Sequence, residues 1–185
     1  PTDFKLFLPR DQEPARSGAY IPRFRTYFEG HVTRSFEYEL SLQRSVEGAF
    51  DVLDANINFR PAEEFQIKVG RFLVPYSYDW YDHLEQFFIT PERALFPLNF
   101  GLSREAGVMV WGELDEGSLQ YALGAFSGQL SGVADNNTTR DAVAYVNARP
   151  FRGGSFPLLE NLNLGGSLGL GDQAFAEEPL LLRTS

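Results

Sequence analysis

The sequence predicts an all-β fold, an antiparallel up-and-down β-barrel of the transmembrane type, from three observations. Apolar and polar residues alternate with a period of two in one segment after another; Phe65, Ile67 and Val69 share one face, for example, and Gln66 and Lys68 the other. Short polar turns separate these segments. Aromatic residues make up 15% of the chain, and membrane barrels place such rings in girdles at the two water interfaces. The alternative is a soluble β-sandwich with a ring-rich core.

Composition excludes several classes of function. The formal net charge of -9 argues against a nucleic-acid partner, because neutralising phosphates requires a basic face. The absence of Cys excludes disulfides and thiolate metal sites. No apolar run approaches the roughly 20 residues of a spanning helix. The chain opens on PTDFKLF without an initiator Met, so we expect a processed or excised piece of a longer protein.

Eight strands are predicted by the alternation. In chain order they are Arg23–Glu29, Phe36–Arg44, Asp51–Arg60, Phe65–Pro75, Gly107–Leu114, Leu119–Phe126, Asp141–Pro150 and Leu162–Leu170. Before them, residues 1–19 contain Pro9, Pro14 and Gly18 among charged residues. This composition predicts an irregular lead-in.

The first four strands are predicted to form a meander. Gly30–His31 is the expected turn after the first strand. The third strand, Asp51–Arg60, has the cleanest alternation in the chain. The residues that follow it, Pro61–Glu64, form a short turn, because Pro suits the first corner of a type I turn. Strands linked by such hairpins lie side by side in chain order.

The last four strands follow a long break. Asp115–Gly117 is a tight turn between the fifth and sixth strands, and residues 128–140 form a polar loop before the seventh. The eighth strand carries Leu168 on one face, and Gly165 and Gly169 on the opposite, polar face. Glycines at such positions allow another element to pack closely against the strand.

The break itself, residues 76–106, is far longer than the usual hairpin loop of about 2 to 5 residues. It contains many rings, among them Trp80, Phe87 and Phe96. We therefore expect a folded insert with a helical turn over Tyr81–Phe88.

Four segments resemble a known family: FRTYFEGHVTRSFEYEL, NINFRPAEEFQIKVGRFLVPYS, PERALFPLNFGLSREAGVMVWGEL and LNLGGSLGLGDQ. Through them the region from Tyr20 to Gln173 resembles the phosphate-selective porins O and P, outer-membrane channels of Gram-negative bacteria. The resemblance implies a barrel of about 16 strands in outer-membrane lipid, usually a homotrimer, that passes small anionic solutes such as phosphate or polyphosphate. Residues 20–185 are then expected to be the N-terminal part of that barrel with about eight strands, and residues 76–106 a constriction-type loop.

Two arginines are predicted at the pore constriction. Arg93 in PERAL and Arg104 in LSREAG match the family's loop, and a guanidinium offers five donors to the oxygens of an anion. The alternative is that both pair with Glu92, Glu105 or another neighbouring carboxylate and hold the loop in place. The loop contains no Lys, which departs from the lysines of the family's phosphate site. The alternation also predicts basic residues on the lumen wall: Arg23, Arg25, Arg60, Lys68 and Arg71. Glu37, Glu39 and Asp54 are expected on similar faces, and such mixed signs suit the transverse field of a general porin.

No enzyme, cofactor or metal site is predicted. The two histidines, His31 and His83, have no spacing to Ser and Asp that indicates a catalytic triad. His83 with Asp79 and Asp82 is better explained as a solvated loop than as a metal site. The functional alternative is a soluble β-sandwich module whose aromatic insert stacks on sugars. In that case the apolar strand faces contact one another, whereas in a porin they contact lipid.

Overall fold

The computed structural model describes residues 3–7, 18–45, 50–81, 104–128, 140–153 and 158–171. Within these residues nine strands form one antiparallel sheet, each paired with its neighbours in chain order. The strands are β1 (Asp3–Phe7), β2 (Gly18–Thr33), β3 (Phe36–Ser45), β4 (Phe50–Phe59), β5 (Gln66–Leu73), β6 (Arg104–Leu114), β7 (Leu119–Phe126), β8 (Asp141–Ala148) and β9 (Leu164–Leu170). This architecture confirms the predicted all-β, up-and-down fold.

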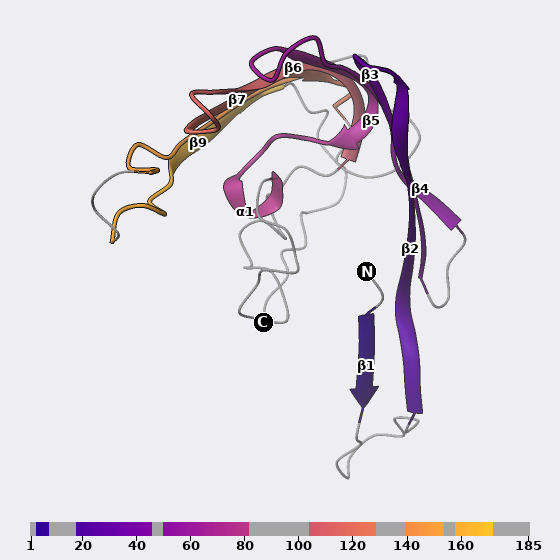
Figure 1. Cartoon of the computed structure of the whole chain (residues 1–185). Helices are drawn as coiled ribbons and strands as arrows, with labels where there is room; N and C mark the ends of the chain where they lie inside the picture. The colour runs from indigo at the N-terminus through magenta and orange to yellow at the C-terminus, as the bar shows by residue number, and fades with distance from the viewer. Residues whose placement is uncertain are drawn as a thin grey trace.

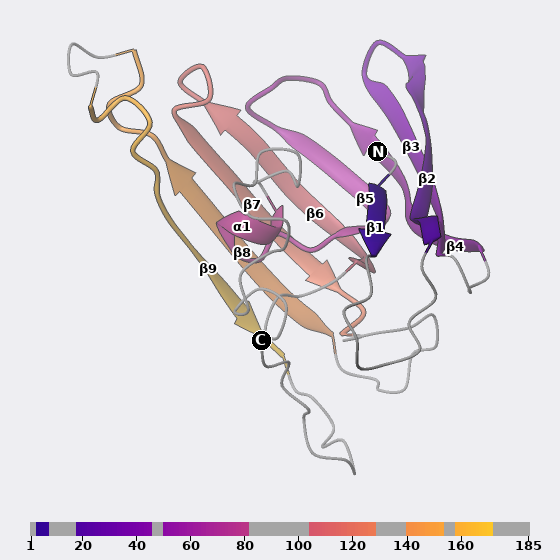
Figure 2. The ribbon, with the colours of Figure 1, turned by 90° about the horizontal axis from the view of Figure 1, so that it is seen from below.

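The sheet is strongly curved, as a section of a barrel wall is. Figure 1 shows it as an arch, with β9 at one end and β2 descending at the other. The short helix α1 (Tyr78–Tyr81) lies on the concave side, and the view from below in Figure 2 shows it over the strands of the second half of the sheet. Among the described residues β1 and β9 are not paired with each other, so this sheet is open.

The two faces of the sheet differ as the alternation predicts. On β4 the side chains of Asp54, Asn56 and Asn58 point to the concave side and are buried, whereas Ile57 between them is 54% exposed. The convex face continues from strand to strand with exposed apolar side chains: Phe28, Leu40, Val69, Val108, Leu123, Val146 and Leu168. An apolar face of this extent suits hydrocarbon rather than water.

The apolar core lies on the concave side, over β5 to β8. It consists of the buried residues Phe72, Val74, Met109, Ala122, Phe126, Val143 and Tyr145. The segment that follows β5 covers this cluster: Val74 and Pro75 are fully buried, and Tyr81 of α1 stacks edge-on against Tyr145, with the ring centroids 5.2 Å apart. The chain therefore turns inward immediately after β5.

Two predicted turns are confirmed and a third is wrong. Pro61–Glu64 connects β4 to β5, and Asp115–Gly117 connects β6 to β7 with all three residues at positive φ. Gly30–His31 is not a turn, because both residues pair with β3 and β2 continues to Thr33. The alternation extends through the glycine, and the turn comes at residues 34–35.

Other boundaries also differ from the expectations. The region expected to be an irregular lead-in contains β1, which pairs with the first residues of β2; the sequence DFKLF alternates, and Pro9 and Pro14 lie after it. The helical turn occurs at Tyr78–Tyr81, earlier than expected, and residues 82–88 lie outside the described part. β6 begins at Arg104, so the connection from β5 covers residues 74–103. No helix within the described ranges has the length and hydropathy to cross a bilayer.

Candidate functional site

The concave face of β2 to β5 is a continuous polar wall. The strand register places His31, Glu37, Asn58 and Lys68 side by side in one row across four strands. Because paired residues of an antiparallel sheet point to the same face, all four side chains lie on the concave side. The concave face therefore carries charged and amide side chains in this part of the sheet, whereas in the second half of the sheet it carries the apolar core.

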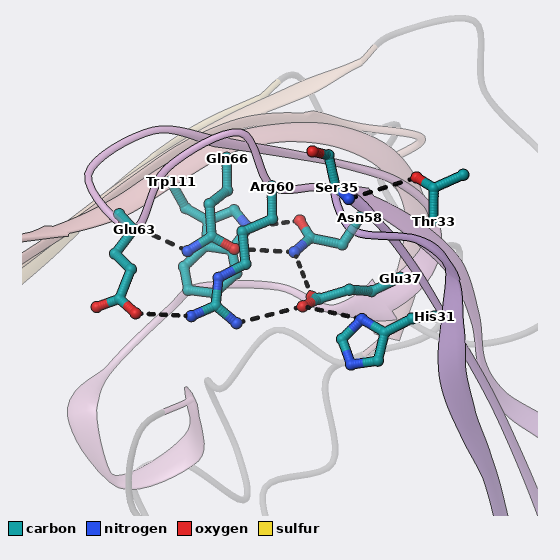
Figure 3. Close-up of polar contacts among 9 residues, drawn as sticks. All are labelled: His31, Thr33, Ser35, Glu37, Asn58, Arg60, Glu63, Gln66 and Trp111. Atoms are coloured by element: carbon teal, nitrogen blue, oxygen red, sulfur yellow. Dashed lines mark hydrogen bonds and ion pairs between the residues drawn. The ribbon is translucent and has the colours of Figure 1, made fainter.

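Asn58 is the centre of this row. Its Nδ2 donates to Glu37 Oε2 at 3.0 Å and to Gln66 Oε1 at 2.8 Å. Its Oδ1 accepts from the indole Nε1 of Trp111 at 3.1 Å. Figure 3 shows these contacts beneath the sheet. Since Asn58 and Gln66 are almost fully buried, the network fixes the side chains of β3 to β6 in one arrangement.

Arg60, at the end of this wall, is neutralised by two carboxylates. Its Nη1 lies 3.2 Å from Glu37 Oε1 and its Nη2 lies 3.0 Å from Glu63 Oε1. The hydrogen bond to Glu37 raises the pKa of Arg60 above its ordinary value. His31 Nδ1 lies 3.8 Å from the same Glu37 oxygen (Figure 3). Arg60 lies on the predicted face, but Glu37 and Glu63 neutralise its charge through direct ion pairs.

Arg104 is paired with a carboxylate of β4. Its Nε donates to Asp54 Oδ1 and Oδ2 at 2.9 and 3.0 Å. Asp54 Oδ2 also accepts from the fully buried Ser41 Oγ at 2.6 Å, so this carboxylate joins β3, β4 and β6. Glu105 is not the partner of Arg104; its Oε2 accepts from the backbone N of Gly128. The pairing with a neighbouring carboxylate is the arrangement expected of a residue that holds the loop base.

Lys68 differs from these arginines. Within the described part of the chain it makes no hydrogen bond and no direct ion pair. Its Nζ lies 5.3 Å from the ring centroid of Trp111 and 5.8 Å from that of Phe72, within cation–π range. The carboxylates of Glu39 and Asp54 attract it from farther away. Lys68 therefore carries a charge that no described side chain neutralises by contact.

Arg71 does not lie on the predicted wall. The register pairs it with Ala55 of β4 and Ala106 of β6, on the apolar convex face, and its Nε donates to the backbone oxygen of Val52 at 3.3 Å. The period of two continues through Gly70. Arg71 is thus on the face opposite to Lys68, and its prediction as a lumen residue is wrong.

The other predicted site residues are only partly described. Arg25 lies on the concave face, where its Nε donates to Gln43 Oε1 at 2.6 Å. The backbone of Arg23 pairs with Ser45, and its side chain lies outside the described part. Arg93 also lies outside it. The proposed constriction is therefore represented here by Arg104 alone.

The start of the β5–β6 connection crosses the concave face to the far end of the sheet. The backbone N of Ser77 donates to Ser167 Oγ of β9 at 3.0 Å. A Cβ atom added to Gly169 would lie 3.5 Å from the ring of Tyr76. The glycines on the polar face of the last strand predicted such a close neighbour, and at Gly169 the neighbour is Tyr76.

Sequence reasoning assigned no role to Asn56, Asn58, Gln66 or Trp111. Alternation predicts the face on which each one lies, but their hydrogen bonds depend on register. Asn56, for example, donates to Glu39 Oε2 at 3.0 Å because the two residues are opposite each other in β4 and β3. The signal that could have identified them is the run of three alternate polar residues in Asp54–Asn58, which is unusual on a buried face.

Comparison with known proteins agrees with this geometry. The family model "phosphate-selective porin O and P" matches residues 2–154, which include β1 to β8. A comparison with curated proteins found no match. A polar concave wall, an apolar convex face and an inward connection are the features of a porin wall. The chain therefore belongs to the phosphate-selective porin O and P family, the outer-membrane porins of Gram-negative bacteria.

Proposed function

We propose that this chain forms part of the wall of a passive diffusion channel for small hydrophilic solutes that carry an anionic group, with phosphate and polyphosphate among the candidates. The observation that carries the proposal is the division of the two faces. Buried amides and carboxylates cover the concave face of β2 to β5, and exposed apolar side chains cover the convex face. A water-filled lumen on one side and lipid on the other require this division.

The inward connection supports a constricted lumen. Val74 and Pro75 are buried on the concave face, and Tyr76 and Ser77 reach β9. We infer that the remainder of residues 76–106 extends from this base and narrows the channel. Arg104 anchors the return of the connection through Asp54.

Anion contact is assigned to Lys68. Among the described basic residues of the concave face, Arg60 and Arg104 are bound by carboxylates and Arg25 is bound by Gln43, whereas Lys68 makes no hydrogen bond or direct ion pair with a described residue. Its ammonium lies near two rings, and Lys68 lines a pocket of the concave face that a passing anionic group can enter. We further propose that the porin assembles as a homotrimer, as is common in this family.

The β-sandwich alternative has no support in the described residues. A sandwich buries apolar strand faces between two sheets. Here the described strands form one sheet, and Ile57 and Leu123 on its apolar face are 54% and 56% exposed.

The test is conductance of the full-length porin in a planar bilayer. We expect stepwise channel openings, and in a KCl gradient Lys68→Met should shift the reversal potential toward cation preference, because one lumen cation is lost. Arg71→Met removes the same charge from the convex face and should leave the potential unchanged. Failure to form channels would refute the porin function, whereas an unchanged potential in Lys68→Met would refute only the assignment of anion contact.

A further inference from the structure

A pocket lies on the polar wall beside Lys68. Its volume is about 390 Å³, and it opens toward the concave side between β2 and β6. The residues that matter for its chemistry are Glu29, Glu39, Asn56, Asn58, Lys68 and Trp111. Figure 3 shows the Asn58 and Trp111 part of this wall. Buried hydrogen bonds to Gln66 and Trp111 hold Asn58 in place in the lining.

The pocket carries charges of both signs, and Lys68 forms no direct ion pair with Glu29 or Glu39. Lys68 forms no direct ion pair with a described residue. Glu29 and Glu39 are opposite each other in β2 and β3. Glu39 accepts a hydrogen bond from Asn56, and Glu29 has no hydrogen bond or ion pair with any described side chain. Glu37, the third carboxylate of the lining, is bound by Arg60.

This arrangement disfavours three simple classes of solute. A free phosphate attracted by Lys68 meets the carboxylates of Glu29 and Glu39, which repel it. A simple cation attracted by those carboxylates meets Lys68. A sugar needs an open aromatic face, but the Lys68 ammonium lies over the Trp111 ring and the indole N–H is bound to Asn58.

A zwitterion satisfies both charges at once. Lys68 and Glu39 attract each other, yet they form no direct ion pair. A solute with a carboxylate and an ammonium close together can bridge these two groups. Two carboxylates directly opposite each other repel, and an ammonium between them relieves this repulsion.

We propose that this pocket is a subsite for zwitterionic solutes, that is, for amino acids or short peptides, with the solute carboxylate on Lys68 and its ammonium on Glu29 and Glu39. The inference rests on the proposed channel function, since the solute reaches the pocket from the lumen. It narrows that function, because the preferred solute is one that carries a carboxylate next to an ammonium group rather than free phosphate.

The experiment measures ion current through the full-length porin in a planar bilayer while L-glutamine is added. We expect a saturable decrease in conductance. The half-saturating concentration should rise about fivefold or more in Lys68→Met, Glu39→Gln and Glu29→Gln, since each variant loses one charge-assisted contact. Glu29 is exposed and has no described partner, so Glu29→Gln is expected to fold even if Lys68→Met does not.

Two matched controls lie outside the pocket. Arg71→Met removes a cation from the convex face, and Glu64→Gln removes an exposed carboxylate from the β4–β5 turn; both should behave as the wild type. L-arabinose and inorganic phosphate are the comparison solutes. Saturable block by phosphate or arabinose at lower concentration than by glutamine overturns the zwitterion subsite, as does an unchanged response in Glu29→Gln and Glu39→Gln. Open channels that glutamine does not block refute the subsite alone, whereas absence of channels refutes the proposed function with it.

Discussion

Asp54→Ala is expected to destabilise the barrel by about 2.5 kcal/mol. The Asp54 carboxylate is almost fully buried and holds two partners, Arg104 Nε at 2.9 Å and Ser41 Oγ at 2.6 Å. A hydrogen bond to a charged group contributes about 1.5 to 3 kcal/mol, and a buried hydroxyl left without an acceptor costs about 1 to 3 kcal/mol. The side chain of Arg104 is 23% exposed, so water recovers part of its loss, and we take the lower end of both ranges.

The assay is urea unfolding of the full-length porin in phosphatidylcholine vesicles, followed by tryptophan fluorescence and extrapolated linearly to water. Asp51→Ala is the control, because Asp51 is an exposed carboxylate on the same strand; its effect should stay within about 0.5 kcal/mol. A double-mutant cycle of Asp54→Ala with Arg104→Met should return a coupling of about 1 to 2 kcal/mol. Equal effects of Asp54→Ala and Asp51→Ala, or no coupling, would refute the proposed link between β4 and β6.

Three further substitutions test the faces and the connection. Val108→Arg should cost about 2 to 4 kcal/mol in the same vesicles if the convex face meets hydrocarbon; an effect no larger than that of Val108→Ala would contradict this. Gly70→Ala should cost about 2 kcal/mol or more, because Gly70 has a φ of 130° and a Cβ would meet the backbone oxygen of Ala55; Gly166→Ala, where a Cβ meets nothing within 4 Å, is the control. Gly169→Leu should change the single-channel conductance by displacing Tyr76, and a wild-type conductance in a folded variant would show that this contact does not shape the lumen.

The strands could be predicted because the alternation has a direct physical cause. Side chains of a strand point alternately to two faces, and a barrel wall separates two different media. Eight strands were found in this way, and they correspond to β2 to β9. β1 was missed because five residues are a weak signal beside two prolines. Arg71 was assigned to the wrong face because residues 71–74 do not alternate. Its face follows only when the period of two in residues 65–69 is continued through Gly70.

The site was less predictable, because whether a charged side chain is paired depends on the residue opposite it on the neighbouring strand. The alternation predicted basic residues on the lumen wall, but the face on which a residue lies cannot show whether its charge is paired. Arg60 and Lys68 both lie on the concave face, yet Arg60 contacts Glu37 whereas the cross-strand neighbours of Lys68 are Asn58 and Met109. Only the strand register distinguishes these two residues. The register depends on where each turn begins and ends, and the sequence locates a turn only to within about a residue or two.

Because of the same register, membership of the family does not by itself imply that this chain selects phosphate. A wall selects phosphate when its cations outnumber the carboxylates that face the solute. In the pocket beside Lys68, Glu29 and Glu39 face the same space as the single unpaired ammonium, while Arg60 is already matched to Glu37. On the proposed function, we therefore expect this wall to hold a solute that brings its own positive charge better than one that brings only negative charge. The polarity of the strands makes this chain a porin wall, and the pairing of their charges decides which solutes it favours.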